Sequence, residues 1–224
     1  MLILVVLLTL AQAASQVKAP AQAPAAAPAV VATPKPTPSG PFVSLEVTQG
    51  RQALGTIAIA LNREKAPISV ENFLQYVKAG HYDGTVFHRV MPGFMIQGGG
   101  YTPELEERPT RPAIKNEGRN GLRNSRGTVA MARISDPNSA TSQFFINVRD
   151  NHRLDFGISG AGYAVFGEVV DGMDVADRIA ATPVTTRGQH QNAPQTSVVI
   201  RRVRELKTWT PPAAKPAADA PPKP

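Results

Sequence analysis

The sequence predicts a mainly β fold, a closed eight-stranded antiparallel β-barrel capped by two α-helices. Eight short segments have the composition or alternation of strands and are separated by clusters of Gly, Asn and Asp, whereas only two segments have helical periodicity. Thirteen of the 21 prolines lie outside residues 42–209, which leaves about 168 residues for the folded part. A chain of that length buries enough surface for one core without disulfides, and the sequence has no cysteine.

The first two strands are predicted at residues 43–48 and 57–61, where large apolar side chains alternate with polar or small ones. A period of two is typical of a half-buried strand, and Gln49-Gly50 between the two segments predicts a hairpin turn. Six more strand segments complete the predicted barrel: Thr85–Val90, Met95–Gly98, Thr128–Arg133, Gln143–Val148, Tyr163–Val169 and a last strand at about Ser197–Leu206.

Two segments predict helices. The first begins near Pro67, ends before Gly80, and carries apolar residues at i, i+3, i+4 and i+7. The second begins after Asp171-Gly172 and places Met173, Ala176, Ile179 and Ala180 on one face. Residues 101–126 follow neither pattern, and irregular segments of that length in a compact domain are more often functional than idle.

The ends of the chain differ in composition from its middle. An apolar run at residues 2–10, followed by the small-x-small site Ala11-Gln12-Ala13, predicts a cleaved signal peptide at residues 1–13 and therefore export. The run is too short to cross a bilayer, which takes about 20 residues, so we expect no stable membrane span. Residues 14–41 form an Ala/Pro-rich linker, and residues 210–224 form a disordered tail of similar composition. The composition of both segments predicts that they are passive tethers. The alternative is that they contain proline motifs that bind another domain.

Charge and motifs exclude several classes of function. The net charge is +7, but four of the 24 basic and one of the 17 acidic residues lie outside residues 42–209, so the folded part carries only +4. With dispersed basic residues and one Trp, we expect no nucleic-acid partner. The four histidines lie far apart without metal-ligand spacing, and neither a nucleophile elbow nor a phosphate loop is present. We therefore expect no metal and no cofactor.

One segment combines an Arg, a Gln and several large apolar residues beside a glycine-rich bend: Phe-His-Arg-Val-Met-Pro-Gly-Phe-Met-Ile-Gln-Gly-Gly at residues 87–99. These thirteen contiguous positions closely resemble the signature of cyclophilin-type peptidyl-prolyl cis-trans isomerases. Residues 127–133, 142–147 and 165–173 continue the resemblance in the order and spacing of that family, over nearly all of residues 42–207. The Ala-Met-Ala-Arg run and the signal peptide together look most like its bacterial periplasmic subgroup.

The resemblance implies a cyclophilin-like barrel whose active groove lies on its outside, with Arg89 as the catalytic residue. Gln97 corresponds to a glutamine that hydrogen-bonds the substrate backbone, and Gln143 to one that steadies the catalytic arginine. Ala132 and Arg133 correspond to the rim that contacts the residue before proline. The proline pocket corresponds to Phe94, Met95, Phe145 and Leu154.

Two positions depart from the eukaryotic pattern of the family. Arg153 stands where that pattern has Trp, and Tyr163 stands where it has His, although Tyr also occurs there in the bacterial branch, so Tyr163 is kept as a groove residue. Because Arg153 lacks the indole ring of that Trp, the resemblance implies weak binding of cyclosporin, the macrocyclic inhibitor of the family. Within the signature, the period of two places Phe87 on the same face as Arg89.

These observations predict an exported prolyl isomerase that acts on proline-containing polypeptides and assists their folding, as a monomer. The main alternative is a non-catalytic module that holds proline-containing segments in the same groove, or a holdase chaperone. A third possibility is a β-barrel that carries a small ligand in its interior. The predicted packing of Phe and Ile inside the barrel disfavours it, because little room is left for a ligand.

Overall fold

The computed structural model describes residues 40–158 and 160–210. The predicted signal peptide lies outside these residues, as do the linker before residue 40 and the tail after residue 210. No helix among the described residues is long and apolar enough to cross a membrane.

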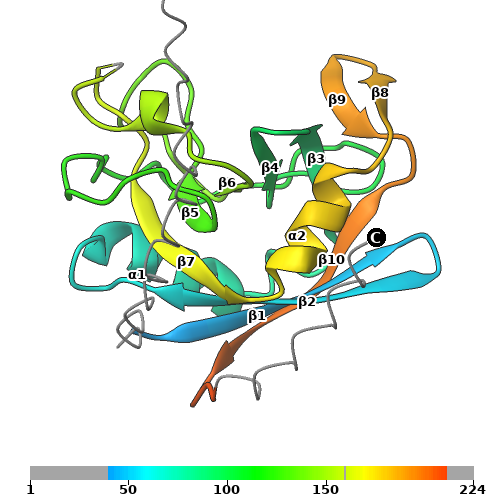
Figure 1. Cartoon of the computed structure of the whole chain (residues 1–224), viewed down its shortest axis with the longest axis horizontal. Helices are drawn as coiled ribbons and strands as arrows, with labels where there is room; N and C mark the ends of the chain where they lie inside the picture. The colour runs from blue at the N-terminus through cyan, green and yellow to red at the C-terminus, as the bar shows by residue number, and fades with distance from the viewer. Residues whose placement is uncertain (1–39, 159, 211–224) are drawn as a thin grey trace, which may run out of the picture. The chain divides into compact units, whose positions relative to one another are not determined.

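Eight antiparallel strands close into a barrel in the order β1-β10-β3-β4-β6-β5-β7-β2 (Figure 1). The predicted fold class is therefore confirmed, and all eight predicted strands are present with ends that differ by a few residues. The barrel strands are β1 (Phe42–Gln49), β2 (Gln52–Leu61), β3 (Thr85–Met91), β4 (Met95–Gly98), β5 (Thr128–Met131), β6 (Phe144–Asn147), β7 (Val165–Asp171) and β10 (Val198–Leu206).

Side chains on the site-bearing strands alternate between the interior of the barrel and its outer face. Ile96 of β4 and Phe144 and Ile146 of β6 belong to the main core, whereas Met95 and Phe145 belong to a second apolar cluster. On β5 the same alternation puts Val129 and Met131 in the main core and Ala130 in the second cluster. Because buried side chains fill the interior, the second cluster lies on the outside of the barrel.

Both predicted helices are present, as α1 (Pro67–Lys78) and α2 (Met173–Ala180), and both pack into the main core. In α1, the Phe73 ring lies 5.5 Å from that of Phe144 and 5.2 Å from that of Phe166. The N-cap of α1 is Ala66, whose side chain cannot accept a hydrogen bond. Glu117 supplies the missing acceptor from the long irregular segment, binding the amides of Ile68 at 3.0 Å and Ser69 at 2.8 Å.

A short hairpin outside the barrel was not predicted. Its strands, β8 (Val184–Arg187) and β9 (His190–Pro194), form a separate two-stranded sheet between α2 and β10. The turn between them uses Gly188, whose φ of +59° suits glycine. A short 3₁₀ helix, η1 (His152–Leu154), was also not predicted.

The prediction that Phe87 and Arg89 share a face is wrong. The β3–β4 pairing runs from Phe87 opposite Gly98 to Arg89 opposite Gln97, so His88 is an extra residue in β3. Such a β-bulge breaks the period of two and re-aims the next side chain. Phe87 consequently lies in the main core, while Arg89 faces the outer groove.

Candidate active site

The ten residues expected to form the site lie together on the outer face of the barrel. Nine of them line one pocket of about 200 Å³: Arg89, Phe94, Met95, Gln97, Ala132, Arg133, Phe145, Leu154 and Tyr163. The tenth, Gln143, lines an adjoining pocket of about 590 Å³, which shares Arg89, Gln97, Ala132 and Arg133 with the first. We call these the small pocket and the large pocket.

The small pocket has an apolar floor. Met95, Phe145 and Ala132 are at most 9% exposed and form the second cluster with Ala130 and Val165. Phe94, Leu154 and Tyr163 pack against this cluster, and the Tyr163 ring meets the Phe145 ring edge-on at 5.7 Å. A pocket of this size and polarity suits a compact apolar ring such as that of proline.

A line of polar side chains crosses the junction of the two pockets. Arg89 donates from Nη1 to Oε1 of Gln97 at 3.4 Å, and Gln97 donates from Nε2 to Oε1 of Gln143 at 2.9 Å. Gln143 therefore contacts Arg89 indirectly, through Gln97. The resemblance implied that Gln143 steadies the arginine directly. A Cβ atom on Gly100 would lie only 2.6 Å from Cγ of Gln143, so the glycine leaves room for this side chain.

Arg133 is fixed at the rim between the pockets. Its Nε donates to the carbonyl of Gly162 at 3.1 Å, and its Nη1 donates to the carbonyl of Ile134 at 2.9 Å. The guanidinium also lies 4.4 Å above the centre of the Tyr163 ring, within the range of a cation–π contact. A substrate that passes the rim therefore meets an arginine whose position is already set.

The large pocket contains residues that the sequence analysis did not single out for the site. Tyr101 and Glu107 come from the long irregular segment, and His190, with its neighbours Gln189 and Gln191, comes from the β8–β9 hairpin. The only sequence signal for that hairpin is a Thr pair followed by Arg-Gly, which is weak.

His88, the bulged residue of β3, lies at the bottom of this region and is 5% exposed. Its ring is 4.5 Å from the Tyr101 ring and 6.2 Å from the His190 ring. Burial lowers the pKa of His88 to about 4, with further lowering from the charges of His190 and Arg89. His88 is therefore neutral at physiological pH, which adds no second positive charge beside Arg89.

The small pocket offers hydrogen bonding and apolar contact. Within residues 40–158 and 160–210, no group of three or more His, Cys, Asp or Glu side chains is placed to hold a metal ion. Arg89 is half-buried and lies on the wall of the apolar small pocket. The geometry thus presents the Arg89 guanidinium on the wall, with Arg133 at the rim, to whatever atom enters that pocket.

Comparison with known proteins gives the family. The family described as cyclophilin type peptidyl-prolyl cis-trans isomerase/CLD matches residues 42–205. The chain is 54% identical over 153 residues to peptidyl-prolyl cis-trans isomerase A of Dickeya dadantii (strain 3937), covering 68% of this chain and 80% of that protein. It is 52% identical over 152 residues to peptidyl-prolyl cis-trans isomerase B of Escherichia coli (strain K12), covering 66% of this chain and 93% of that protein.

The fold resembles solved structures of the same kind. A Cryptosporidium parvum cyclophilin type peptidyl-prolyl cis-trans isomerase, crystallised in the presence of the dipeptide Ala-Pro, matches with a TM-score of 0.60. The match covers 75% of this chain and 99% of that chain at 24% sequence identity, and it supports the fold alone. From the family match and the bacterial relatives it follows that the chain belongs to the cyclophilin-type peptidyl-prolyl cis-trans isomerases and is an enzyme of that class.

Proposed function

We propose that the protein is exported to the periplasm, where it accelerates the folding of other exported chains by interconverting cis and trans X–Pro bonds. The apolar run and the small-x-small site at residues 2–13 support export, and the bacterial relatives support the reaction. We also propose that it acts as a monomer.

The observation that carries the mechanism is the position of Arg89 on the wall of the small pocket. An X–Pro amide resists rotation by about 18–20 kcal/mol because the lone pair of the prolyl nitrogen is shared with the carbonyl group. When the bond twists, the nitrogen becomes pyramidal and its lone pair is free to accept a hydrogen bond. A guanidinium that donates to this nitrogen stabilises the twisted state over either planar state.

A thousandfold acceleration requires about 4 kcal/mol. One hydrogen bond from a charged donor contributes about 1.5–3 kcal/mol, so Arg89 alone falls short. The dry floor of the small pocket supplies part of the remainder, because a hydrogen bond is stronger where water is excluded. Gln97 supplies another part by holding the neighbouring backbone, so that rotation is confined to one side of the bond.

The two pockets support one direction for the bound chain. Proline occupies the small pocket, and the residue before it lies at the rim formed by Ala132 and Arg133. Because both rim residues also line the large pocket, the preceding part of the substrate enters the large pocket. The part that follows proline therefore leaves the site on the opposite side.

A refolding assay tests this function against the non-catalytic alternative. The substrate is an unfolded protein whose slow phase is limited by an X–Pro bond, which takes tens to hundreds of seconds unaided. The wild-type protein should shorten the slow phase at catalytic concentrations, and folded Arg89→Ala should not. If the wild-type protein suppresses aggregation but leaves the slow phase unchanged, the holdase alternative is correct.

Export has its own test. The full-length chain is expressed in a bacterium with an outer membrane, and the protein released by osmotic shock is identified by its N-terminal sequence. A mature protein that begins just after Ala13 is expected. Finding Met1 retained on protein from the cytoplasmic fraction alone would overturn the proposed location.

A further inference from the structure

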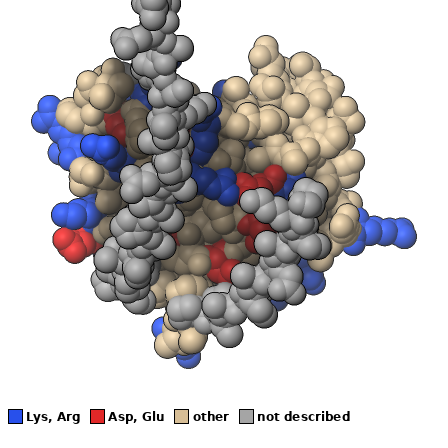
Figure 2. All heavy atoms as spheres, viewed as in Figure 1, with Lys and Arg blue, Asp and Glu red and all other residues tan. Residues whose placement is uncertain are grey.

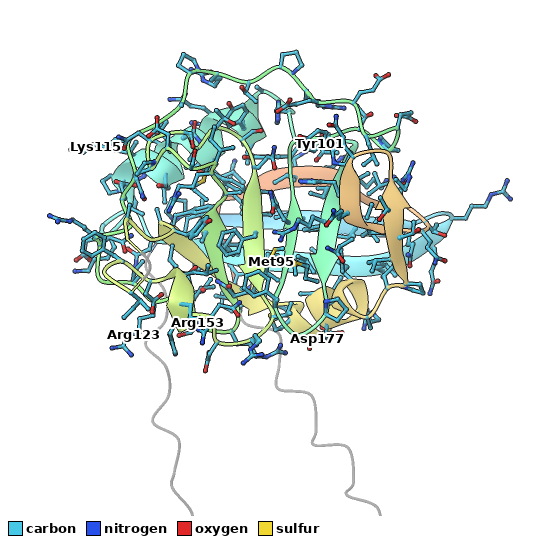
Figure 3. All side chains as sticks on the ribbon, turned by 90° about the horizontal axis from the view of Figure 1, so that it is seen from above. Met95, Tyr101, Lys115, Arg123, Arg153 and Asp177 are labelled. Atoms are coloured by element: carbon cyan, nitrogen blue, oxygen red, sulfur yellow. The ribbon has the colours of Figure 1, made fainter. Side chains whose placement is uncertain are left out.

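Two arginines stand beside the small pocket on the side away from the large pocket. Leu122 and Leu154 both pack against the apolar cluster that floors the small pocket. Arg123 follows the first leucine and Arg153 precedes the second, and both arginine side chains are exposed. Figure 3 shows Arg123 and Arg153 at the same edge of the molecule, to one side of Met95.

The segments that carry these arginines are fixed to each other. Asn151 donates its amide to the carbonyl of Asn124 at 2.7 Å, and Asn124 donates its amide to Oδ1 of Asp155 at 2.7 Å. Asn124 is fully buried and donates again to Oδ1 of Asp155 from its side chain, at 3.1 Å. The backbone segments that carry the two arginines are therefore held together by hydrogen bonds.

Neither Arg123 nor Arg153 forms a salt bridge with a carboxylate of the described residues. The carboxylates on this side have other partners, since Asp155 binds Asn124 and His152, and Asp150 accepts the amide of Arg126. Asp177 is paired with the Arg126 guanidinium at 2.7 Å.

The positive charge extends around this edge of the site. Arg119 and Arg149 are also exposed, and neither forms a salt bridge with a carboxylate of the described residues. In Figure 2 the blue Lys and Arg side chains gather at the left, over the green to yellow-green loops of Figure 1, whereas the region of the β8–β9 hairpin is largely uncharged. The large pocket, on that other side, contains Glu107 and three residues of the hairpin.

We propose that Arg123 and Arg153 bind an acidic side chain that follows proline in the substrate, and so make this isomerase prefer Pro-Glu and Pro-Asp segments. The inference rests on the proposed direction of the bound chain, in which the residues after proline leave the small pocket toward these arginines. An extended chain advances about 3.3 Å per residue, so the side chain directly after proline is the first to leave the small pocket on that side.

The sequence of the chain itself agrees with this preference. None of the 13 prolines that flank the folded part is followed by Asp or Glu, and Pro34 and Pro222 are followed by Lys. The paired arginines would bind such segments poorly. On this proposal the charges that favour acidic substrates disfavour binding of the enzyme's own Ala/Pro-rich segments.

The test uses three peptides that differ only after proline: Ala-Ala-Pro-Glu-Ala, Ala-Ala-Pro-Gln-Ala and Ala-Ala-Pro-Lys-Ala with blocked ends. Their interconversion is measured with the full-length protein at low ionic strength. We expect kcat/KM to be about two to five times higher for Glu than for Gln, and lower again for Lys. Raising the salt to about 0.5 M should bring the three values together, because exposed charges are screened.

Two variants separate the role of this pair from the general charge of the protein. The double variant Arg123→Gln/Arg153→Gln should bring the Glu to Gln ratio close to one. Arg51→Gln removes an exposed arginine in the turn between β1 and β2 and should keep the wild-type ratio. Equal kcat/KM for all three peptides with wild-type protein at low salt would overturn the inference while leaving the isomerase intact. If no peptide is turned over at all, the proposed function fails instead.

Discussion

Gln97 donates its side-chain amide to the side-chain carbonyl of Gln143 at 2.9 Å, and its own carbonyl oxygen faces Nη1 of Arg89 at 3.4 Å. Gln143 is thereby a positioning residue that acts on the guanidinium through Gln97. We predict that Gln143→Ala lowers kcat about tenfold while KM changes less than twofold, because misplacing a catalytic group costs rate more than binding. Peptide exchange kinetics at several substrate concentrations measure both, with thermal unfolding as a check on the fold.

Gly100 gives an independent control on this relationship. A Cβ at this position would crowd the Gln143 side chain, so Gly100→Ala should lower kcat in the same way. In the Gln143→Ala background the glycine substitution should have little further effect, because its target is gone. Additive losses in the double variant would mean that Gln143 does not act on Arg89 along this path.

Acid should destabilise the protein through His88. Its pKa is lowered to about 4 by burial and by the charges of His190 and Arg89, whereas an unfolded histidine titrates near 6.5. The unfolded chain therefore binds the proton first as pH falls, and the stability is complete above about pH 6.5 and is lost progressively down to about pH 4. The loss amounts to about 3 kcal/mol.

Urea unfolding at pH 7 and pH 4.5 measures this effect. The free energy of unfolding of His88→Gln should fall less between the two pH values than that of the wild-type protein, even if the variant is less stable at pH 7. Parallel declines would show that His88 is not the group responsible. His81, whose pKa is also lowered by burial, is unchanged in both proteins and cancels in the comparison.

Glu117 should stabilise helix α1 from a distance. Its carboxylate accepts hydrogen bonds from the amides of Ile68 and Ser69 and from the Ser69 hydroxyl, the last at 2.7 Å. Glu117→Ala leaves these donors unsatisfied and should cost about 2 kcal/mol of unfolding free energy. Glu64→Gln is the control, since Glu64 is an exposed acid just before the same helix and its salt bridge to Lys65 is long, at 3.6 Å. This substitution should cost less than about 0.5 kcal/mol. Equal costs would contradict the capping role.

Arg153 should limit the affinity for cyclosporin. A mobile cation replaces the flat apolar face and N–H donor of the indole found there in the eukaryotic pattern, so calorimetry should give a Kd above one micromolar. Arg153→Trp should tighten binding about tenfold, in the range that one buried aromatic contact contributes. Arg51→Trp, far from the groove, should leave the Kd unchanged. Submicromolar binding by the wild-type protein would refute this prediction.

Most of the fold could be predicted from the sequence because its strands and helices follow local periodicities. The alternation along β4, β5 and β6 separates core from groove residue by residue, and the contiguous signature at residues 87–99 supplies four of the ten predicted site residues. The bulge at His88 was missed because it depends on the register against β4, which no local pattern reveals.

Contacts between segments distant in sequence explain the other omissions. Glu117 caps a helix 48 residues away, and the β8–β9 hairpin forms one side of the large pocket without a clear alternation of its own. The contact of Gln97 with Gln143, 46 residues later in the chain, likewise depends on the pairing of β4 with β6.

The most direct test of the account is the rate of cis–trans exchange in an Ala-Pro peptide, measured by exchange NMR with wild-type protein and with Arg89→Ala after both are shown to be folded. We predict a large acceleration by the wild-type protein, about a thousandfold over the unaided bond, and its loss in the folded variant. An undiminished acceleration by Arg89→Ala would contradict the assigned role of the arginine, and no acceleration by the folded wild-type protein would contradict the mechanism as a whole.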